Sequence, residues 1–213
     1  MKKEKNDKQN DNRTVVDVPE NEEYRYELKI PKERVAVLIG KSGEVKSEIE
    51  SFAKIKITVD SKEGDVFISG KDPIMLYAAK EVIKAVGRGF NPEIANLLFK
   101  QDYMFELMSI LDFAKTKNDI IRLKGRIIGS GGKSRNVIEQ LTETYICVYG
   151  KTVGIVGEIS SVSTARRAIE LLLEGSPHSN VFKFLEKERR KIKRESLQGG
   201  DVEIKEEAKR FRI

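Results

Sequence analysis

Two short glycine loops are the residues of this chain whose types and spacing most favour a specific chemistry. Gly40-Lys41-Ser42-Gly43 is followed 89 positions later by Gly129-Ser130-Gly131-Gly132, and an isoleucine precedes each loop. Glycine adopts positive φ and allows another backbone to approach closely. A helix that follows such a loop has unpaired first amides with partial positive charge, which suit a phosphate group. The loops therefore predict a grip for a nucleic-acid backbone.

Two other glycine motifs fail on single positions. A P-loop needs a glycine five residues before its Gly-Lys-Ser end, but Val35 and Ile127 stand there in the two copies. A dinucleotide fingerprint needs a third glycine where the second copy has Ser134. Both nucleotide-binding interpretations are therefore disfavoured.

The similarity between the two loops extends over about twenty positions, which indicates a repeat. The same offset of 89 pairs Ile49-Glu50 with Ile138-Glu139, Ile57 with Ile146 and Val59 with Val148. The register of apolar residues and glycines thus predicts two copies of one small domain.

The first copy has the order strand, helix, helix, strand, strand, helix. Alternation from Tyr24 to Ile30 predicts a half-buried strand, and Asp72 with Pro73 predicts the start of the last helix. The remaining elements are expected at residues 34–39, 44–52, 54–59 and 64–68.

The second copy is expected to repeat this order. We predict its first strand at residues 119–123, a helical turn at 125–128, a helix at 133–143, a hairpin around Gly150-Lys151 and a helix ending at Leu173. A helical segment between the copies is expected to continue through Phe105 and Met108 and to brace the domains. The domains are predicted as a disordered charged tail at 1–22, a first domain at 23–90, a helical linker at 91–116, a second domain with a C-terminal basic helix at 117–193, and a charged tail at 194–213.

Composition limits the chemistry. The 213 residues include 40 Lys and Arg against 34 Asp and Glu, a net charge of +6, which permits an acidic polymer as partner but is equally typical of a basic soluble protein. One Cys and one His cannot form a structural zinc site or an internal disulfide, and Cys147 is expected to be a small core residue. We predict no metal and no cofactor. No long apolar stretch and no signal peptide are visible, which predicts a cytoplasmic protein.

The candidate RNA-binding residues comprise the loops, neighbouring cations and an apolar floor that could accept unstacked bases of single-stranded RNA. In the second copy they are Lys124, Gly125, Arg126, Ile128, Gly129, Ser130, Gly131, Gly132, Lys133, Ser134, Arg135, Ile146 and Val148. In the first copy they are Ile39, Gly40, Lys41, Ser42, Gly43, Lys46 and Ile57. Gly125 has an alternative role as helix punctuation, and for Ile49 and Ile138 the core role is favoured.

A basic strip near the C-terminus is a further candidate for RNA contact. Its members are Lys187, Arg189, Arg190, Lys191, Lys193 and Arg194, interrupted by one acidic residue. A solvated helix face is the alternative interpretation.

The repeated pattern resembles the type I K-homology (KH) domain, and this resemblance covers about 150 residues. It implies an α+β fold with two tandem type I KH domains, β-α-α-β-β-α each, and extra helices in the linker and at the C-terminus. Residues 125–135 (GRIIGSGGKSR), Ile138-Glu139, Ile155-Val156-Gly157 and residues 173–177 (LEGSP) further resemble the tandem-KH ribosome-biogenesis proteins of archaea and eukaryotes.

That family resemblance implies a non-catalytic protein that binds the 3′ region of small-subunit rRNA, with the second copy as the principal RNA site. It also implies a PIN-domain endonuclease, or another ribosome-assembly or translation factor, as a possible protein partner. Many members have a degraded first loop, whereas residues 40–43 are intact here, so the first copy is left with two roles, RNA binding or a protein interface. A prokaryote-type, archaeal cytoplasm is expected.

Two other functions compete. One is a KH adaptor for mRNA or for an RNA-degrading complex, which composition does not separate from the first. The other is a nuclease, for which Asp60, Glu63 and Asp65 form the one compact acidic group of the first domain, although a solvated turn is favoured. His178 has no acid–base pair and is expected to contact a partner or solvent.

Overall fold

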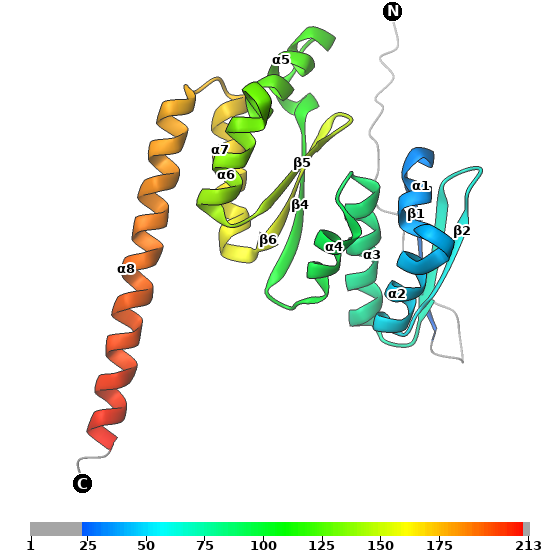
Figure 1. The fold of residues 1–213 in the computed structure, drawn as a ribbon, viewed down its shortest axis with the longest axis horizontal. Coiled ribbons are helices and arrows are strands. Elements are labelled where there is room, and N and C mark those ends of the chain that lie inside the picture. The colour runs from blue at the N-terminus through cyan, green and yellow to red at the C-terminus, as the bar shows by residue number, and fades with distance from the viewer. Residues whose placement is uncertain (1–22, 211–213) are drawn as a thin grey trace, which may run out of the picture. The chain divides into compact units, whose positions relative to one another are not determined.

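The computed structural model describes residues 23–210, with side chains as far as residue 194 (Figure 1). The predicted tail at 1–22 lies outside the described residues, as do the side chains of most of the predicted tail at 194–213. The chain divides between Gly87 and Arg88 into two compact units.

The first unit has the predicted strand and helix order. Its elements are β1 (Tyr24–Lys29), α1 (Lys32–Ile39), the single turn η1 (Lys41–Gly43), α2 (Glu44–Ala53), β2 (Lys56–Asp60), β3 (Asp65–Gly70) and α3 (Pro73–Gly87). The strands form an antiparallel sheet in the order β1-β3-β2. Asp72 caps α3 as predicted, because its carboxylate accepts hydrogen bonds from the amides of Ile74 and Met75.

Alternation along the strands of the first unit decides which face of the sheet is buried. Val66 and Ile68 of β3 and Ile57 of β2 are buried, whereas Phe67 between them is exposed. The buried face packs with apolar residues of the helices, among them Leu38, Ile49, Leu76, Val82, Ile83 and Val86.

The second unit adds elements before and after the repeated order. Its elements are α4 (Pro92–Ala95), η2 (Asn96–Phe99), β4 (Tyr103–Ser109), η3 (Ile110–Phe113), α5 (Lys117–Ile128), η4 (Ser130–Gly132), α6 (Lys133–Thr142), β5 (Tyr145–Tyr149), β6 (Thr152–Glu158), α7 (Ile159–Leu173) and α8 (His178–Arg210). The sheet order β4-β6-β5 repeats that of the first unit. The predicted hairpin is confirmed, with Tyr149 opposite Thr152 across a two-residue turn.

Two of the predicted elements are wrong. Residues 119–123 were expected to be the first strand of the second copy, but they lie inside α5. The first strand is β4, which contains Phe105 and Met108 and lies in the segment expected to be a helical linker. Within the predicted linker the helical segments are α4, η2 and the single turn η3, and β4 lies before the start predicted for the second domain at residue 117.

The cause is an unequal spacing between the two copies. Gly129 follows Gly40 by 89 positions, but Tyr103, the first residue of β4, follows Tyr24 of β1 by only 79. Counted from the start of its first strand to its loop, the second copy therefore has ten additional residues, most of which form η3 and lengthen the helix before the loop. Thr116 and Asp119 begin that helix with a capping box, a start signal that the strand assignment overlooked.

The outer face of the second sheet is covered by the segment that precedes it. Phe90 is buried and packs edge-on against Phe105 of β4, with ring centroids 5.9 Å apart. The absence of a side chain at Gly154 makes room for Phe90, and Gly89 lies against Cys147 and Tyr149 of β5. Cys147, predicted to be a core residue, is thus half-buried on this face.

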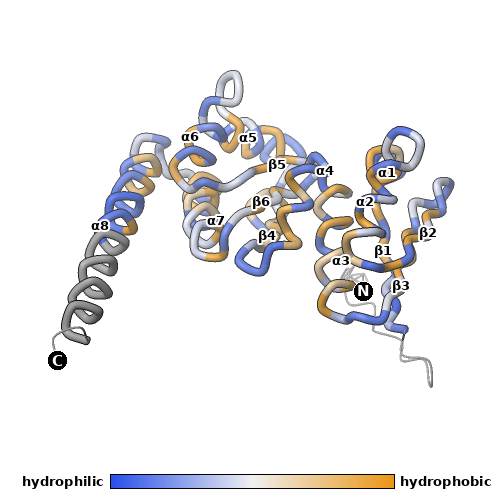
Figure 2. Tube along the Cα trace, turned by 60° about the horizontal axis from the view of Figure 1, so that its bottom comes forward, coloured by the Kyte–Doolittle hydropathy of each residue, from blue (hydrophilic) through white to orange (hydrophobic). Residues whose placement is uncertain are grey.

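The last helix, α8, is long, but few of its residues are apolar. α8 is anchored at its start by the buried residues Val181 and Leu185 and is mostly hydrophilic as far as residue 194 (Figure 2). It continues to Arg210, past the boundary at 194 predicted for the charged tail. Of the helices between residues 23 and 210, none combines the length and apolar composition that crossing a bilayer requires.

Candidate nucleic-acid interface

The two glycine loops have the same backbone conformation. The first glycines, Gly40 and Gly129, have φ of 75° and 74° with ψ near 180°, a region that only glycine enters readily. The third positions, Ser42 and Gly131, are left-handed with φ of 55° and 59°. The sequence repeat is therefore a repeat of backbone geometry, since the loops agree to within a few degrees.

The first glycine of each loop is required by packing. A Cβ on Gly129 would lie 2.7 Å from the Cβ and from the amide nitrogen of Ser134, and one on Gly40 would lie 2.6 Å from a methyl group of Val45. Ser134 and Val45 occupy the same position in the two copies. The chain thus turns tightly against the first turn of the next helix.

The later glycines of each loop are open to solvent. A Cβ on Gly131 or Gly43 would meet nothing within 4 Å. Gly132 and Gly43 are the N-caps of α6 and α2, and neither helix start receives a side-chain cap. The first amides of both helices therefore keep their partial positive charge beside an open backbone, where an anionic group can bind.

A glutamate holds the helix behind each loop to the adjacent strand. The Glu139 carboxylate accepts a hydrogen bond of 2.7 Å from the backbone amide of Ile146, and Glu50 accepts one of the same length from Ile57. The repeat within the sequence aligns these two glutamates, but it gave no indication of this role. Because each bond joins the helix to its strand, it sets how far the two lie apart.

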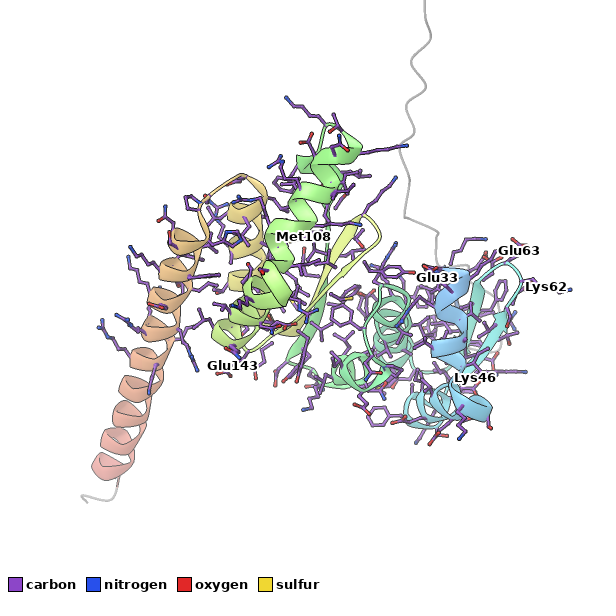
Figure 3. The ribbon with its side chains drawn as sticks, turned by 45° about the horizontal axis from the view of Figure 1, so that its top comes forward. Glu33, Lys46, Lys62, Glu63, Met108 and Glu143 are labelled. Atoms are coloured by element: carbon purple, nitrogen blue, oxygen red, sulfur yellow. The ribbon has the colours of Figure 1, made fainter. Side chains whose placement is uncertain are left out.

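A cation one turn earlier pairs with each of these glutamates. Arg135 Nε lies 3.6 Å from Glu139 Oε2, and Lys46 Nζ lies 3.8 Å from Glu50 Oε1. Figure 3 shows Lys46 on α2 of the first unit. Both cations were predicted to contact RNA, and the pairing orients them along the helix that follows the loop.

Several predicted site residues are not available at the surface. Ser134 is 4% exposed beneath the loop, and Ile146 and Ile57 are buried in the cores. Ile128, Ile39 and Val148 are half-buried and can contribute to an apolar floor. The accessible members of the predicted sites are Lys41, Ser42, Gly125, Ser130, Gly131 and Lys133.

Arg126 is engaged within the protein. Its guanidinium donates to the carbonyl oxygens of Leu172 and Ser176, at 3.0 and 2.6 Å. His178 Nε2 lies 2.8 Å from the carbonyl oxygen of Arg126. His178 is half-buried, and this bond joins the start of α8 to α5, an internal contact that the sequence did not predict. Lys124, also predicted to contact RNA, is half-buried on α5.

The acidic turn of the first unit has the features of a solvated turn. Asp60 accepts a hydrogen bond from the backbone amide of Lys62, Glu63 pairs with Lys32, and Asp65 pairs with Lys29. Among the described residues, no three His, Cys, Asp or Glu side chains are grouped so that they could hold a metal ion.

The predicted basic strip lies on α8, and all six of its cations are exposed. Arg189 lies 3.9 Å from Glu143 at the end of α6, and Arg190 pairs with Glu186 one turn earlier on α8. The strip thus begins close to the helix that follows the second loop.

Each unit combines a β-α-α-β-β-α order with a G-x-x-G loop open at a helix N-terminus, which defines a protein with two type I KH domains. Comparison with known families agrees with this class. Residues 104–190 match the eukaryotic-type KH domain (KH-domain type I), and residues 25–85 match the KH domain.

Named relatives narrow the class to one family. The KH domain-containing protein MJ0443 of Methanocaldococcus jannaschii is 51% identical over 171 residues, covering 78% of this chain and 75% of the relative. The RNA-binding protein PNO1 of Oryzias latipes is 36% identical over 114 residues, which are 53% of this chain and 47% of the relative.

Solved structures give the same result. Dim2p from Pyrococcus horikoshii is 41% identical with a TM-score of 0.72, and the match covers 76% of this chain and 98% of that one. The crystal structure of an a/eIF2alpha-aDim2p-rRNA complex from P. horikoshii also matches, with 40% identity and a TM-score of 0.75. This match covers 79% of this chain and 96% of that one. The present chain belongs to the PNO1/Dim2 family of KH-domain proteins.

Proposed function

We propose that this protein is a non-catalytic assembly factor for the small ribosomal subunit, which binds single-stranded RNA near the 3′ end of small-subunit rRNA. The second KH domain is its principal RNA site. The observation that carries the proposal is the open backbone at Gly131 and Gly132, placed directly before the uncapped first turn of α6.

The chemistry of that site suits an RNA backbone. The loop amides and the exposed Lys133 supply donors and positive charge to a phosphate, while half-buried Ile128 and Val148 offer apolar surface to an unstacked base. Arg126 and Ser134 are left out of the contacting group, because the first is bound to carbonyl oxygens and the second is buried.

The target is supported by a relative. The P. horikoshii complex contains aDim2p together with rRNA and a/eIF2alpha. We extend RNA binding to this chain and expect a translation factor, or a PIN-domain endonuclease, as the protein partner. For such an assembly factor in an archaeal cell, the site of action is the cytoplasm.

Position Gly131 offers a test of the loop that does not disturb the fold. Ser42 already holds the equivalent left-handed conformation in the first loop, so a side chain is tolerated there. Gly131→Asp places a negative charge where the phosphate should bind, and Gly131→Asn is its neutral control of nearly equal size. We expect the aspartate variant to lose tenfold or more of the affinity for the rRNA oligonucleotide, and the asparagine variant to lose much less.

The target sequence needs a separate experiment. Binding of the full chain to a short oligonucleotide matching the 3′ end of small-subunit rRNA is compared with binding to a scrambled one, over a salt series. A preference that persists as salt rises indicates base recognition and supports the ribosomal role. Equal binding that collapses with salt would instead favour the alternative function, a KH adaptor for mRNA or for an RNA-degrading complex.

For the loop test with the Gly131 variants, equal loss of affinity in Gly131→Asp and Gly131→Asn would contradict the phosphate contact.

A further inference from the structure

The outer face of the first sheet is open, unlike that of the second. In the second unit Phe90 covers this face, but in the first unit Arg25, Phe67 and Lys56 are all exposed. Phe67 stands in the central strand β3 and is 46% exposed. Two copies of one fold therefore differ in whether the face opposite the helices is available.

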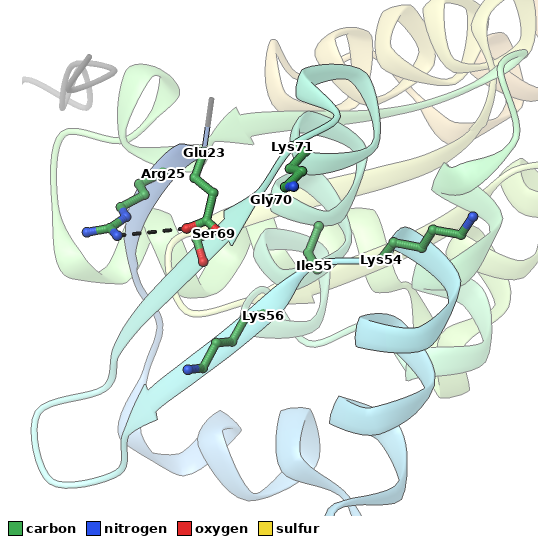
Figure 4. A pocket seen from close by; sticks show the side chains of 8 residues that line it. All are labelled: Glu23, Arg25, Lys54, Ile55, Lys56, Ser69, Gly70 and Lys71. Atoms are coloured by element: carbon green, nitrogen blue, oxygen red, sulfur yellow. Dashed lines mark ion pairs between the residues drawn. The ribbon is translucent and has the colours of Figure 1, made fainter. Parts of the chain in front are cut away.

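A basic pocket of about 390 Å³ lies at one end of this open face. Figure 4 shows its lining residues: Glu23, Arg25, Lys54, Ile55, Lys56, Ser69, Gly70 and Lys71. The lining includes four cations and one carboxylate, a formal excess of three positive charges. Glu23 lies 3.8 Å from Arg25, so the remaining charge belongs to the lysines.

The strand register places the cations in one row. Arg25 of β1 and Lys56 of β2 both stand opposite Ser69 of β3, one on each side. Lys71 follows two residues beyond Ser69 and also lines the pocket. Arg25 of β1, Lys56 of β2 and Lys71, which follows the end of β3, thus bring positive charge to one end of the sheet.

Phe67 is the next outward residue along the central strand. It lies two positions before Ser69, and such residues share one face of a sheet about 7 Å apart. Its neighbours across the sheet are Glu27 and Thr58, so no larger ring covers it. Proteins that bind single-stranded nucleic acids combine exposed aromatic rings, on which bases stack, with nearby cations that contact phosphates. Phe67 beside these cations is such a combination.

We propose that this open sheet face is a second RNA site, separate from the glycine loops, in which Phe67 stacks on an unpaired base and Lys56 and Lys71 contact the adjoining phosphate. The inference rests on the proposed RNA-binding function and extends it to a longer strand than a single loop can hold. An acidic protein segment would use the cations but would leave the exposed ring without a role, so RNA is the favoured ligand.

The test uses the full chain and two single-stranded RNAs, one of about four nucleotides, the length that a KH loop clamps, and one several times longer. The variants are Lys56→Ala and Phe67→Leu. The matched control is Lys62→Ala, which removes an exposed lysine in the turn of the same hairpin (Figure 3), a residue that does not line the pocket. All three positions are exposed, and thermal unfolding checks that each variant keeps its fold.

We expect Lys56→Ala and Phe67→Leu each to weaken binding of the long RNA about threefold or more, with little change for the short RNA. For Lys56→Ala the slope of log affinity against log salt should become shallower by about 0.7, the value for one lost phosphate contact on a single strand. Lys62→Ala should change neither quantity appreciably. Ultraviolet cross-linking of the long RNA should attach it to the peptide that contains Phe67.

Three results overturn the inference and differ in what they leave standing. Long-RNA binding that Lys56→Ala and Phe67→Leu leave unchanged, while Gly131→Asp abolishes it, removes the sheet-face site and keeps the loop. Unchanged RNA binding together with loss of poly-glutamate binding in Lys56→Ala assigns the face to an acidic protein segment. Absence of binding to either RNA by the unmodified chain overturns the proposed function and this site together.

Discussion

The carboxylate of Glu139 on α6 accepts a 2.7 Å hydrogen bond from the backbone amide of Ile146 on β5, and Glu50 and Ile57 repeat the bond in the first unit. In each copy the bond joins the helix that begins at the glycine loop to the strand whose side chains line the core. The position of the loop relative to the sheet therefore depends on one polar contact as well as on apolar packing.

Replacing Glu139 should separate this structural role from a role in RNA contact. Glu139→Ala leaves the Ile146 amide without its acceptor, which should lower the free energy of unfolding by about 1–3 kcal/mol. Glu139→Gln keeps an acceptor and should cost less. Urea unfolding of both variants is the measurement, with Glu143→Ala as a control at a carboxylate that is 78% exposed. Equal stability of the alanine and glutamine variants would show that the bond contributes nothing.

The two kinds of loop glycine should respond differently to a methyl group. Gly129→Ala introduces a Cβ 2.7 Å from Ser134 in a conformation that only glycine tolerates, and should cost about 2 kcal/mol or more. Gly131→Ala adds a methyl group in open space and should cost about 1 kcal/mol, the usual penalty of left-handed backbone. Thermal unfolding of the two variants measures the difference. A larger loss for Gly131→Ala would mean that the packing at Gly129 is not what requires glycine.

Arg126 should act through stability rather than through phosphate binding. Arg126→Ala removes hydrogen bonds to the carbonyl oxygens of Leu172 and Ser176, and we expect a loss of about 2 kcal/mol in the free energy of unfolding. Arg126→Lys keeps the charge but lacks the planar group that reaches both oxygens, so it should recover little stability.

The RNA affinity of the same variants distinguishes the two roles. If Arg126 contacted phosphate, the lysine variant would retain the affinity and the salt dependence of the unmodified protein, while the alanine variant would bind with a shallower salt dependence. If Arg126 instead only holds the carbonyl oxygens of Leu172 and Ser176, the salt dependence should be unchanged in both variants.

Acid should weaken the ion pairs on α7 at a predictable point. Hydrogen bonding from Arg166 and then Arg167 lowers the pKa of Glu170 below its ordinary value of 4.5. Because the folded pKa is the lower one, the stabilisation is complete well above pH 4.5 and is lost as the pH falls through the folded value. At neutral pH Glu170→Gln should therefore cost about 0.2–1 kcal/mol, the range for exposed pairs.

The check is urea unfolding of the unmodified protein and Glu170→Gln across an acid series. Their stabilities should converge as the pH falls below 4.5. A difference that stays constant down to strongly acidic pH would show that Glu170 acts by packing and not by its charge.

Sequence periodicity was sufficient for the first unit and failed at one point in the second. The strand from Tyr24 and the helix that begins at Pro73 lie where alternation and capping predicted them. β4 was missed because a fixed repeat offset cannot reveal an insertion, and the apolar residues around Asp119 fit a strand as well as one face of a helix. The Thr116–Asp119 capping box was the signal that would have separated the two.

The amino-acid sequence by itself determined the repeat, the fold of the first domain, the elements of the second domain after its first strand, and the two glycine loops. Such features depend on local chemistry, namely positive φ at glycine, helix caps and the alternation of apolar residues. Tertiary structure alone decided which site residues are accessible, because burial depends on segments distant in the chain. Arg126 is held by carbonyl oxygens 46 and 50 residues away, Ile146 is buried in the core, and the first sheet keeps an open face that Phe90 covers in the second.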